Sequence, residues 1–372
     1  MLIFVRSYLS AYDARIQKYF HVMERLGLSY AFIGWRRDEK PYQPQPYEIL
    51  YERRGKLGAR WKNAFNIIGW NVFIFAALAK RRRQVSAVHA VDLDTALVVY
   101  LYCRLFGKAF IFDVYDKYSA VRNITGLAGK MMDALERYLA RHADLTLLAG
   151  EDRLEQMQLA PGLENCLVLE NVPLNATPAT ALPKFDGKWR IGYFGVLEPV
   201  HRGLEDLMRV AGTRDDVELH LAGYGGLETM AAELAASHEN IHYHGPMGSD
   251  AGLDLMAQMH VMVGMYYLSV PNHAYAAPNK YFEHLMLGRG MLTTAGTSPG
   301  RKVEAFSTGW AIAEGKEALH SWLSELKWDE VENAGKAARE LWDQKYQPYF
   351  EDHYVSLYGR HVADMLKTDD HD

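Results

Sequence analysis

The chain has 372 residues, of which 49 % are hydrophobic, 23 % charged and 12 % aromatic, and this is the composition of an ordinary globular protein. Its length predicts two domains, and the lack of low-complexity tracts and heptad repeats excludes a disordered chain and a coiled coil. The only cysteines are Cys103 and Cys166, far apart in sequence. This excludes a disulfide scaffold and a cysteine-rich zinc site, and it favours a reducing compartment.

The net charge of −5 hides an asymmetry between the two halves of the chain. Residues 1–180 carry 24 Lys and Arg against 18 Asp and Glu, whereas the remainder carries 17 against 28. A basic first half and an acidic second half predict two units with different partners. The acidic net charge also argues against a nucleic-acid binder.

The first fifteen residues contain a short apolar run without a signal-peptide cleavage site, and they predict a β-strand. The most apolar stretch, 64–79, is too short to span a bilayer and lies between the basic runs 53–62 and 80–83. It is interpreted either as a buried helix with solvated charged ends or as a helix on anionic lipid, with Trp61 and Trp70 at the interface. A cytoplasmic protein is expected, peripheral on the inner face of the plasma membrane if segment 53–83 contacts lipid.

In the first half, short apolar runs alternate with longer helical patterns, which is typical of a parallel sheet built from βαβ units. The predicted strands are 2–5, 28–33, 87–89, 109–113, 145–148 and 166–169, and the main predicted helices are 15–26, 94–106 and 126–142. A segment rich in Pro, Ala, Thr and Asn, 171–188, then predicts an interdomain linker.

A second alternation of strands and helices follows the linker. The predicted strands are 189–193, 217–222, 241–243, 261–265 and 291–293, the predicted helices are 203–210, 226–236, 253–259 and 281–287, and a long helical stretch, 329–366, is interrupted near Pro348. We therefore predict an α/β fold of two Rossmann-like domains. The expected domains are 1–175 and 184–347, with 348–372 as a C-terminal helix that returns to the first domain. In such sheets, ligands bind at the loops that follow the carboxyl ends of the strands.

Two common motifs are missing. There is no GxGxxG after the first strand, and GxxxxGK[ST] does not occur, so dinucleotide oxidoreductases and P-loop proteins are excluded. His242 and His244 alternate on a predicted strand without thiolate or carboxylate neighbours, so no metal site is expected there.

Three segments of the second half carry candidate ligand-binding residues. In 192–208, Arg202 precedes Gly203 at the start of a predicted helix, where a guanidinium and free N–H groups can hold a diphosphate; the alternative is a solvent-facing arginine. In 218–226, Gly223 and Gly225 allow close backbone approach to a ligand, although glycines also make tight turns. The next predicted strand ends at a turn, where backbone groups of Gly245 and Met247 can pair with a nucleobase edge.

The third segment, 271–294, holds the strongest motif. Lys280 and Glu283 are three residues apart at the start of a predicted helix and therefore share one face. Lys280 can neutralise phosphate and Glu283 can accept two hydrogen bonds from a ribose diol; the alternative is an ordinary ion pair. The adjoining Asn279 and Tyr281 complete this candidate donor site.

The segment PNKYFEHLMLGRGMLTT resembles the donor-site signature of bacterial GT-B glycosyltransferases, most closely the family 4-like enzymes that build capsule, exopolysaccharide and lipopolysaccharide chains. The resemblance covers most of the chain. It implies that Glu283 is the glutamate at the start of the donor-site helix. It also implies that Arg202, in GVLEPVHRGLEDL, is the cation of the phosphate loop.

Two features depart from the family pattern. Family 4 enzymes commonly carry a second glutamate eight residues before the first, and here that position is Tyr275. The common arginine before the phosphate loop is replaced by Gly195 and Val196. The donor sugar and the retention or inversion of its configuration are therefore left open.

In the first half, the resemblance implies that the loop after 109–113 lies near the reacting sugar. Asp116 is the candidate general base for the acceptor hydroxyl, and Asp113 is either catalytic or a structural cap. Asp92 and Asp94 compete for this role, with Asp94 also a candidate N-cap. A final set consists of candidates for phosphate or acceptor contact: Asp13, Arg15 and Lys18, of which Arg15 and Lys18 also fit a solvated helix face.

These observations predict a glycosyltransferase that moves a sugar from a nucleotide diphosphate sugar, with UDP expected, to a hydroxyl of a glycan or lipid-linked saccharide in cell-surface polysaccharide synthesis. No metal and no cofactor are expected, because fixed cations can stabilise the leaving diphosphate. The alternatives are a nucleotide-sugar 2-epimerase on the same scaffold and a non-catalytic binding subunit.

Overall fold

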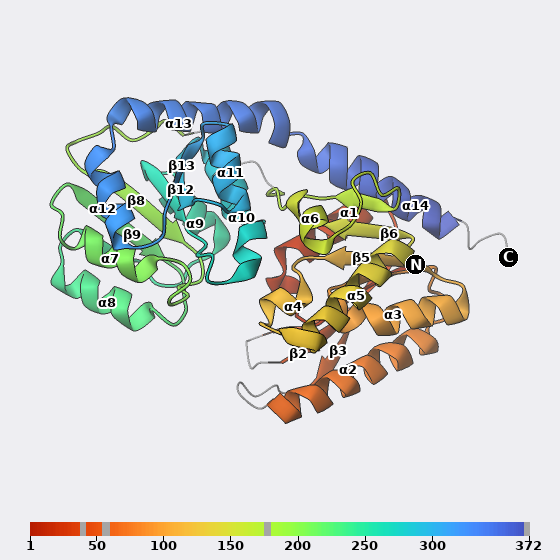
Figure 1. Ribbon diagram of the computed structural model, residues 1–372. Coiled ribbons are helices and arrows are strands. Elements are labelled where there is room, and N and C mark those ends of the chain that lie inside the picture. Colours follow the sequence, from red (N-terminus) through yellow and green to blue (C-terminus); the bar gives the residue numbers. More distant parts are fainter. Residues whose placement is uncertain (38–41, 54–59, 175–179, 368–372) are drawn as a thin grey trace. The chain divides into compact units, whose positions relative to one another are not determined.

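A computed structural model describes residues 1–37, 42–53, 60–174 and 180–367, and for 60–65 only the backbone. The chain divides into two compact units (Figure 1). The first contains Met1–Glu170 and Phe350–Asp372, and the second contains Asn171–Tyr349. The expected α/β class, with two Rossmann-like domains, is confirmed. The C-terminal segment belongs to the first unit, so the chain passes between the units twice.

The first unit is built on a seven-stranded parallel sheet in the order β3-β2-β1-β4-β5-β6-β7. Its strands are β1 (Leu2–Arg6), β2 (Tyr30–Arg36), β3 (Glu48–Glu52), β4 (Ala87–Val91), β5 (Ala109–Val114), β6 (Leu145–Leu148) and β7 (Cys166–Val168). The central strands are buried on both faces, which explains their nearly continuous apolar sequences. The strand order reverses between β1 and β4, the place where open α/β sheets bind ligands.

Helices cover both faces of this sheet. They are α1 (Ala14–Arg25), α2 (Arg60–Lys80), α3 (Leu93–Phe106), α4 (Tyr118–Val121), α5 (Gly126–His142) and α6 (Asp152–Met157), with η1 (Ser10–Tyr12), η4 (Phe350–Tyr358) and α14 (Gly359–Lys367). Among the described residues, no helix has both the length and the apolar character needed to cross a bilayer.

The second unit repeats the architecture with six parallel strands in the order β10-β9-β8-β11-β12-β13. The strands are β8 (Trp189–Phe194), β9 (Val217–Ala222), β10 (Ile241–Tyr243), β11 (Val261–Gly264), β12 (Gly290–Thr294) and β13 (Gly309–Ile312). The helices are α7 (Leu204–Ala211), α8 (Glu228–Ser237), α9 (Ser249–Met256), η2 (Pro271–Tyr275), α10 (Asn279–Leu287), α11 (Ser298–Ala305), α12 (Lys316–Glu325), α13 (Trp328–Leu341) and η3 (Trp342–Tyr346).

Two strands, β3 and β13, were not predicted from the sequence. β3 and β13 each form one edge of their sheet and are only partly buried; the opposite edge strands, β7 and β10, were predicted. The apolar stretch 64–79 lies within the longer helix α2. Trp70 is buried and stacks on Trp35, which fits the buried-helix alternative and contradicts the interfacial position for this residue. The side chain of Trp61 and most of the basic run 53–62 lie outside the described residues.

A buried polar network ties the C-terminal segment to the first sheet. Arg15 of α1 forms a two-pronged ion pair with Asp113 of β5, with N–O distances of 3.1 and 3.2 Å. The hydroxyl of Tyr19 also donates to Asp113, at 2.6 Å. Arg15 also donates to the hydroxyl of Tyr354, while His89 of β4 lies 2.9 Å from the hydroxyl of Tyr358. Because both tyrosines belong to η4, the network holds the returning segment against β4 and β5.

Glu136 of α5 is a buried carboxyl group whose Oε1 accepts from the Tyr118 amide at 3.3 Å, while its Oε2 has no hydrogen-bond partner. Burial raises the pKa of Glu136 to about 8. The folded state therefore retains a proton that the unfolded chain releases near pH 4.5. This contribution to stability is complete below about pH 4.5 and is lost as the pH rises through 8.

We expect Glu136→Gln to remove this pH dependence. The variant should match the wild type near pH 5 and exceed its free energy of unfolding by a few kcal/mol (~2–4) above pH 8. Urea denaturation at pH 5 to 9 measures the difference, and Glu155→Gln, at an exposed position of α6, is the matched control. An equal difference at pH 5 and pH 9 would contradict the assignment.

Candidate functional site

The loop from Gly195 to Gly203 joins β8 to α7 at the carboxyl edge of the second sheet. Gly203 has φ +62°, and a Cβ there would lie 2.6 Å from the Tyr267 hydroxyl. Val200 adopts φ +70°, a conformation that β-branched residues avoid, and its amide donates to Glu205. Backbone strain of this kind is retained where the surrounding structure enforces it, often at functional sites.

The glycines of the next loop are required by packing between the two loops. A Cβ on Gly223 would lie 1.7 Å from the Gly195 carbonyl oxygen, and one on Gly225 would lie 2.5 Å from that of Leu197. Both glycines also have positive φ. The expected donor contact of Gly223 and Gly225 stays a prediction, but their glycine character follows from the approach of these two backbones.

Lys280, in the first turn of α10, extends to the loop that follows β8. Its Nζ lies 4.3 Å from the centre of the Tyr193 ring and would be 2.5 Å from a Cβ on Gly195. Burial opposes the charged form, but the neighbouring oxygens of Tyr193, Tyr266 and Glu283 raise the pKa of Lys280 above its usual value. Lys280 is therefore a fixed cation beside the Gly195 backbone.

Arg202 supplies a second cation to the same place. Its guanidinium lies 4.7 Å from the ring centre of Tyr266, and its Nε donates to Glu198 at 2.9 Å. Burial raises the pKa of Tyr266, against the opposing charges of Lys280 and Arg202. A Cβ on Gly264 would lie 3.6 Å from both the Lys280 side chain and the Tyr266 ring, so Arg202 and Lys280, predicted from two distant motifs, both lie near Tyr266.

Glu283 follows Lys280 by one helical turn and is partly buried. Its charge raises the pKa of both Lys280 and Tyr266, so it belongs to the same group of side chains. Two cations and one carboxylate thus face a glycine loop at a strand end. Such an arrangement can hold a diphosphate and a diol on neighbouring subsites.

Four other residues of this unit were predicted to contact the donor: Asn279, Gly245, Met247 and Tyr281. Asn279 is exposed at the start of α10, and Gly245 and Met247 lie in the loop after β10, where the Gly245 carbonyl accepts from the Gly223 amide at 2.9 Å. The ring of Tyr281 is buried against Phe282 and His284, so the expected donor contact of Tyr281 stays a prediction for its backbone only. A helix places adjacent residues on different faces, so Tyr281 cannot share the face of Lys280 and Glu283.

In the first unit, polar side chains gather at the carboxyl ends of β1, β4 and β5. Arg6 forms ion pairs with Asp13 and Asp92, and Asp92 also accepts from the Tyr115 amide. Burial raises the pKa of Asp92 to about 6 against the opposing effect of Arg6. Asp92 has φ +59°, which is uncommon outside glycine. Asp92 was predicted only as a competitor of Asp116, since neither its strain nor its burial is visible in sequence.

Asp116 is the accessible carboxylate of this edge. Its side chain is 47 % exposed, and one oxygen accepts from the buried Arg153 at 2.5 Å. Asp113 behaves differently, because it has no exposed surface and its oxygens are held by Arg15 and Tyr19. Burial opposes its ionisation, but Arg15 and His89 together outweigh this and lower the pKa of Asp113 to about 2. Its structural role is therefore favoured over catalysis.

Arg15 and Lys18 are both buried, so the alternative of a solvated helix face was wrong for them. Arg15 is committed to Asp113 and to the Leu169 carbonyl. The ammonium of Lys18 lies 5.8 Å from the ring centre of Tyr354. Asp13 caps α1 through the amides of Arg15 and Ile16 and also pairs with Arg6. These contacts give Asp13, Arg15 and Lys18 structural roles, and their expected contact with phosphate or acceptor stays a prediction.

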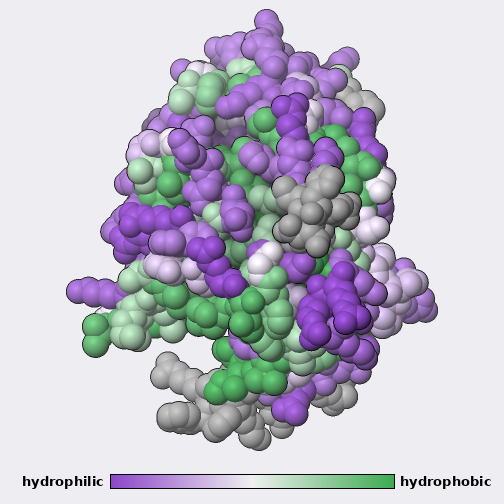
Figure 2. Space-filling model, turned by 90° about the vertical axis from the view of Figure 1, so that its right-hand side faces the viewer, coloured by the Kyte–Doolittle hydropathy of each residue, from purple (hydrophilic) through white to green (hydrophobic). Residues whose placement is uncertain are grey.

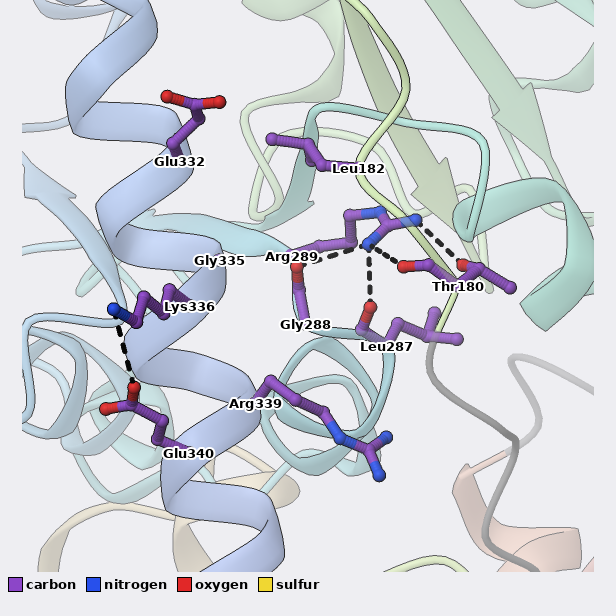
Figure 3. A pocket seen from close by; sticks show the side chains of 10 residues that line it. All are labelled: Thr180, Leu182, Leu287, Gly288, Arg289, Glu332, Gly335, Lys336, Arg339 and Glu340. Atoms are coloured by element: carbon purple, nitrogen blue, oxygen red, sulfur yellow. Dashed lines mark hydrogen bonds and ion pairs between the residues drawn. The ribbon is translucent and has the colours of Figure 1, made fainter.

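A cavity of about 380 Å³ lies elsewhere in the second unit, between α13 and the turn after α10 (Figure 3). The buried Arg289 lines it, and burial lowers the pKa of Arg289 to about 10. Its N–H groups donate to backbone carbonyls of Ala181, Ala257, Leu287 and Gly288, and to Thr180. The guanidinium thus fastens the end of the linker to the unit, and its donors are already used by the protein.

Within the part of the chain that the structure describes, no group of three or more His, Cys, Asp or Glu side chains is arranged to hold a metal ion. His220, His242 and His244 stack side by side at the β9–β10 edge, with His220 and His244 nitrogens 3.1 Å apart. The pKa of His220 is lowered to about 4, mainly by burial and to a smaller extent by the charges of His242 and His244.

The fold is shared with solved structures at low sequence identity. Sucrose-phosphate synthase from Thermosynechococcus elongatus matches with a TM-score of 0.68 at 13 % identity, over 98 % of this chain and 99 % of that one. Anabaena HepE, solved with UDP and glucose, matches with a TM-score of 0.68 at 10 % identity, over 96 % of this chain and 99 % of that one. WaaG, a glycosyltransferase involved in lipopolysaccharide biosynthesis, matches with a TM-score of 0.65 at 14 % identity, over 95 % of this chain and 98 % of that one. Neither a protein-family model nor a curated protein matches the sequence. The chain therefore has the GT-B fold, as its motifs led us to expect.

We expect Gly195→Ala to displace Lys280. The added methyl group would meet the ammonium, and the residue would have to keep φ +146°, which costs about 1–3 kcal/mol. Lys280 should then be acetylated by acetic anhydride several times faster than in the wild type, as measured by peptide mass spectrometry. Gly248→Ala is the control, because a Cβ there meets no atom within 4 Å. An unchanged rate in Gly195→Ala would contradict the contact.

Proposed function

We propose that this protein is a glycosyltransferase that moves a sugar from a nucleotide diphosphate sugar to a hydroxyl of a glycan or lipid-linked saccharide in cell-surface polysaccharide synthesis. The observation that carries the proposal is the convergence of Arg202 and Lys280 on the glycine loop after β8, with Glu283 one turn further along α10. The fold shared with HepE, which was solved with UDP, supports a nucleotide diphosphate as the leaving group.

Each of these residues has a role in the proposed reaction. Arg202 and Lys280 stabilise the negative charge that develops on the diphosphate as the bond from the sugar's anomeric carbon to the phosphate oxygen breaks. That oxygen keeps the electron pair. Because both cations are supplied by the chain, no metal ion is needed in this proposal. Glu283 accepts hydrogen bonds from the ribose hydroxyls and holds the nucleotide in register.

The first unit supplies the acceptor side of the reaction in this proposal. The acceptor oxygen forms the new bond to the anomeric carbon and loses its proton to Asp116, the carboxylate that a sugar hydroxyl can reach. Asp92 is the alternative base at this edge, because burial raises its pKa to about 6. A pKa near the working pH suits a group that takes the proton of the acceptor hydroxyl.

The experiment that tests the proposal is calorimetric titration of UDP and GDP into the wild type and Glu283→Ala. We expect UDP to bind and the variant to lose about 1–3 kcal/mol of binding free energy, the cost of removing a charged acceptor. Glu233→Ala, at an exposed position of α8, and Asp116→Asn should bind UDP as the wild type does. If neither nucleotide binds the wild type, the proposal fails and the non-catalytic alternative is favoured.

We also propose that the outer face of α2 and α3 contacts the membrane that holds the acceptor. The two helices pack side by side, and large apolar side chains are exposed on both: Ile68, Val72, Leu97, Leu101 and Leu105. Figure 2 shows hydrophobic residues gathered in the lower part of this face of the molecule. Exposed basic residues border the patch: Lys80, Arg82, Arg83 and Arg104. Apolar area beside positive charge fits an anionic lipid surface.

Vesicle co-sedimentation tests this contact. The wild type should bind vesicles of phosphatidylglycerol and phosphatidylcholine, and Leu101→Glu/Leu105→Glu should bind at least tenfold more weakly, because it places charge in the apolar patch. Leu357→Glu, at an exposed position of η4, should behave as the wild type. Equal binding of the double variant would exclude this face as the lipid contact.

A further inference from the structure

Two arginines of the first unit share one buried carboxylate. Arg37 follows β2 and Arg122 ends α4, and their Nη2 atoms lie 3.6 and 3.5 Å from Oδ2 of Asp94. The same oxygen already accepts from the Ser7 hydroxyl at 2.6 Å. The group therefore lies over the carboxyl ends of the adjacent strands β2, β1 and β4 and beside the segment that follows β5.

Aromatic rings hold both guanidinium groups in place. Arg37 lies 4.0 Å from the ring centre of Trp35, and Arg122 lies 3.7 Å from that of Tyr118. Each side chain is a little over one third exposed, whereas Asp94 is almost completely buried beneath them. Stacking fixes the plane of a guanidinium and leaves its N–H edge available to a planar or tetrahedral anion.

Among the residues that the structure describes, no group accepts a hydrogen bond from the guanidinium of Arg37 or Arg122. The distances to Asp94 exceed a hydrogen bond. The Nε of Arg37 is buried without a partner. Arg15 offers the contrast in the same unit, because its guanidinium grips Asp113 at 3.1 and 3.2 Å and also donates to the Leu169 carbonyl.

The two arginines outnumber the carboxylate that they share. Two guanidinium groups face Asp94, and Arg6, which is itself paired with Asp13 and Asp92, also opposes the protonation of Arg37. Burial, offset in part by Asp94 and reinforced by Arg122 and Arg6, lowers the pKa of Arg37. A bound anion would relieve this repulsion and would satisfy the open donors at the same time.

We propose that Arg37 and Arg122 form an anion-binding subsite that recognises a phosphate or carboxylate group on the acceptor. This inference rests on the proposed glycosyl transfer and narrows the acceptor to an acidic saccharide, either phosphorylated or containing a uronic acid. Asp94 and Ser7 form the floor that positions the two guanidinium groups. Trp35 and Tyr118 form the walls.

Calorimetric titration of inorganic phosphate, with UDP at saturation to occupy the donor site, tests the subsite. Arg37→Gln/Arg122→Gln should bind phosphate at least tenfold more weakly than the wild type. Arg37→Lys/Arg122→Lys, which keeps the charge but loses the planar fork, should bind with intermediate affinity. The matched control is Lys345→Gln, because Lys345 is an exposed cation over the ring of Tyr346 in the second unit, outside the subsite. Equal phosphate affinity in the wild type and the glutamine variant would overturn the proposal.

Further arms identify the source of the anion. Tighter binding of phosphate than of glucuronate supports a phosphorylated acceptor, and the reverse supports a uronic acid. Arginine-dependent binding to vesicles with phosphatidic acid, without binding of free phosphate, assigns the anion to a lipid-linked acceptor. A tenfold loss of UDP affinity in the glutamine variant would assign the arginines to the donor and overturn the acceptor subsite. If UDP does not bind the wild type but phosphate binding still requires both arginines, the proposed function fails and the anion site stands.

Discussion

The buried ion pair between Arg15 and Asp113 is the interaction on which the first unit depends. It lies inside the unit, where an unpaired charge would be strongly destabilising, so α1 and β5 must adopt one relative position. Tyr19, His89 and the tyrosines of η4 complete the network, and through them the end of the chain is held beside its beginning. The strand ends that carry Arg6, Asp92 and Asp116 are positioned by this core.

The molecule contains two kinds of arginine. Arg15 and Arg289 are buried, and their donors are filled by carboxylate, carbonyl or hydroxyl oxygens, so they join segments that are distant in sequence. Arg37 and Arg122 lie over aromatic rings and remain partly exposed. Arg202 is intermediate, because it lies over the ring of Tyr266 but its Nε is paired with Glu198. A ring fixes a guanidinium without neutralising it, whereas a carboxylate does both. Arginines of the second kind lie at the carboxyl edges of the sheets, where parallel α/β folds bind ligands.

Much of the fold could be predicted because each central strand is a short apolar run and each amphipathic helix has a clear period. The predicted strand 145–148 and helix 126–142 agree with β6 and α5 to the residue, and the interruption near Pro348 separates η3 from η4. The edge strands β3 and β13 were missed, whereas the other two edge strands, β7 and β10, were predicted, so edge position alone does not explain the omission. In β3, a glutamate at each end shortens the apolar run. The helix α2 was seen only in its apolar middle, since its ends carry polar residues.

By itself, the sequence determined the two-unit α/β architecture and the proximity of Lys280 to Glu283, because apolar periodicity and helical spacing are local properties. Only the tertiary structure decided which charges are available to a ligand. Arg15 and Arg37 look alike in sequence, yet one is saturated by Asp113 and the other has open donors above Asp94. Likewise, Asp113 and Asp116 are three residues apart, but one is buried and the other exposed. The physical reason is that burial and charge pairing depend on residues brought together from distant segments of the chain.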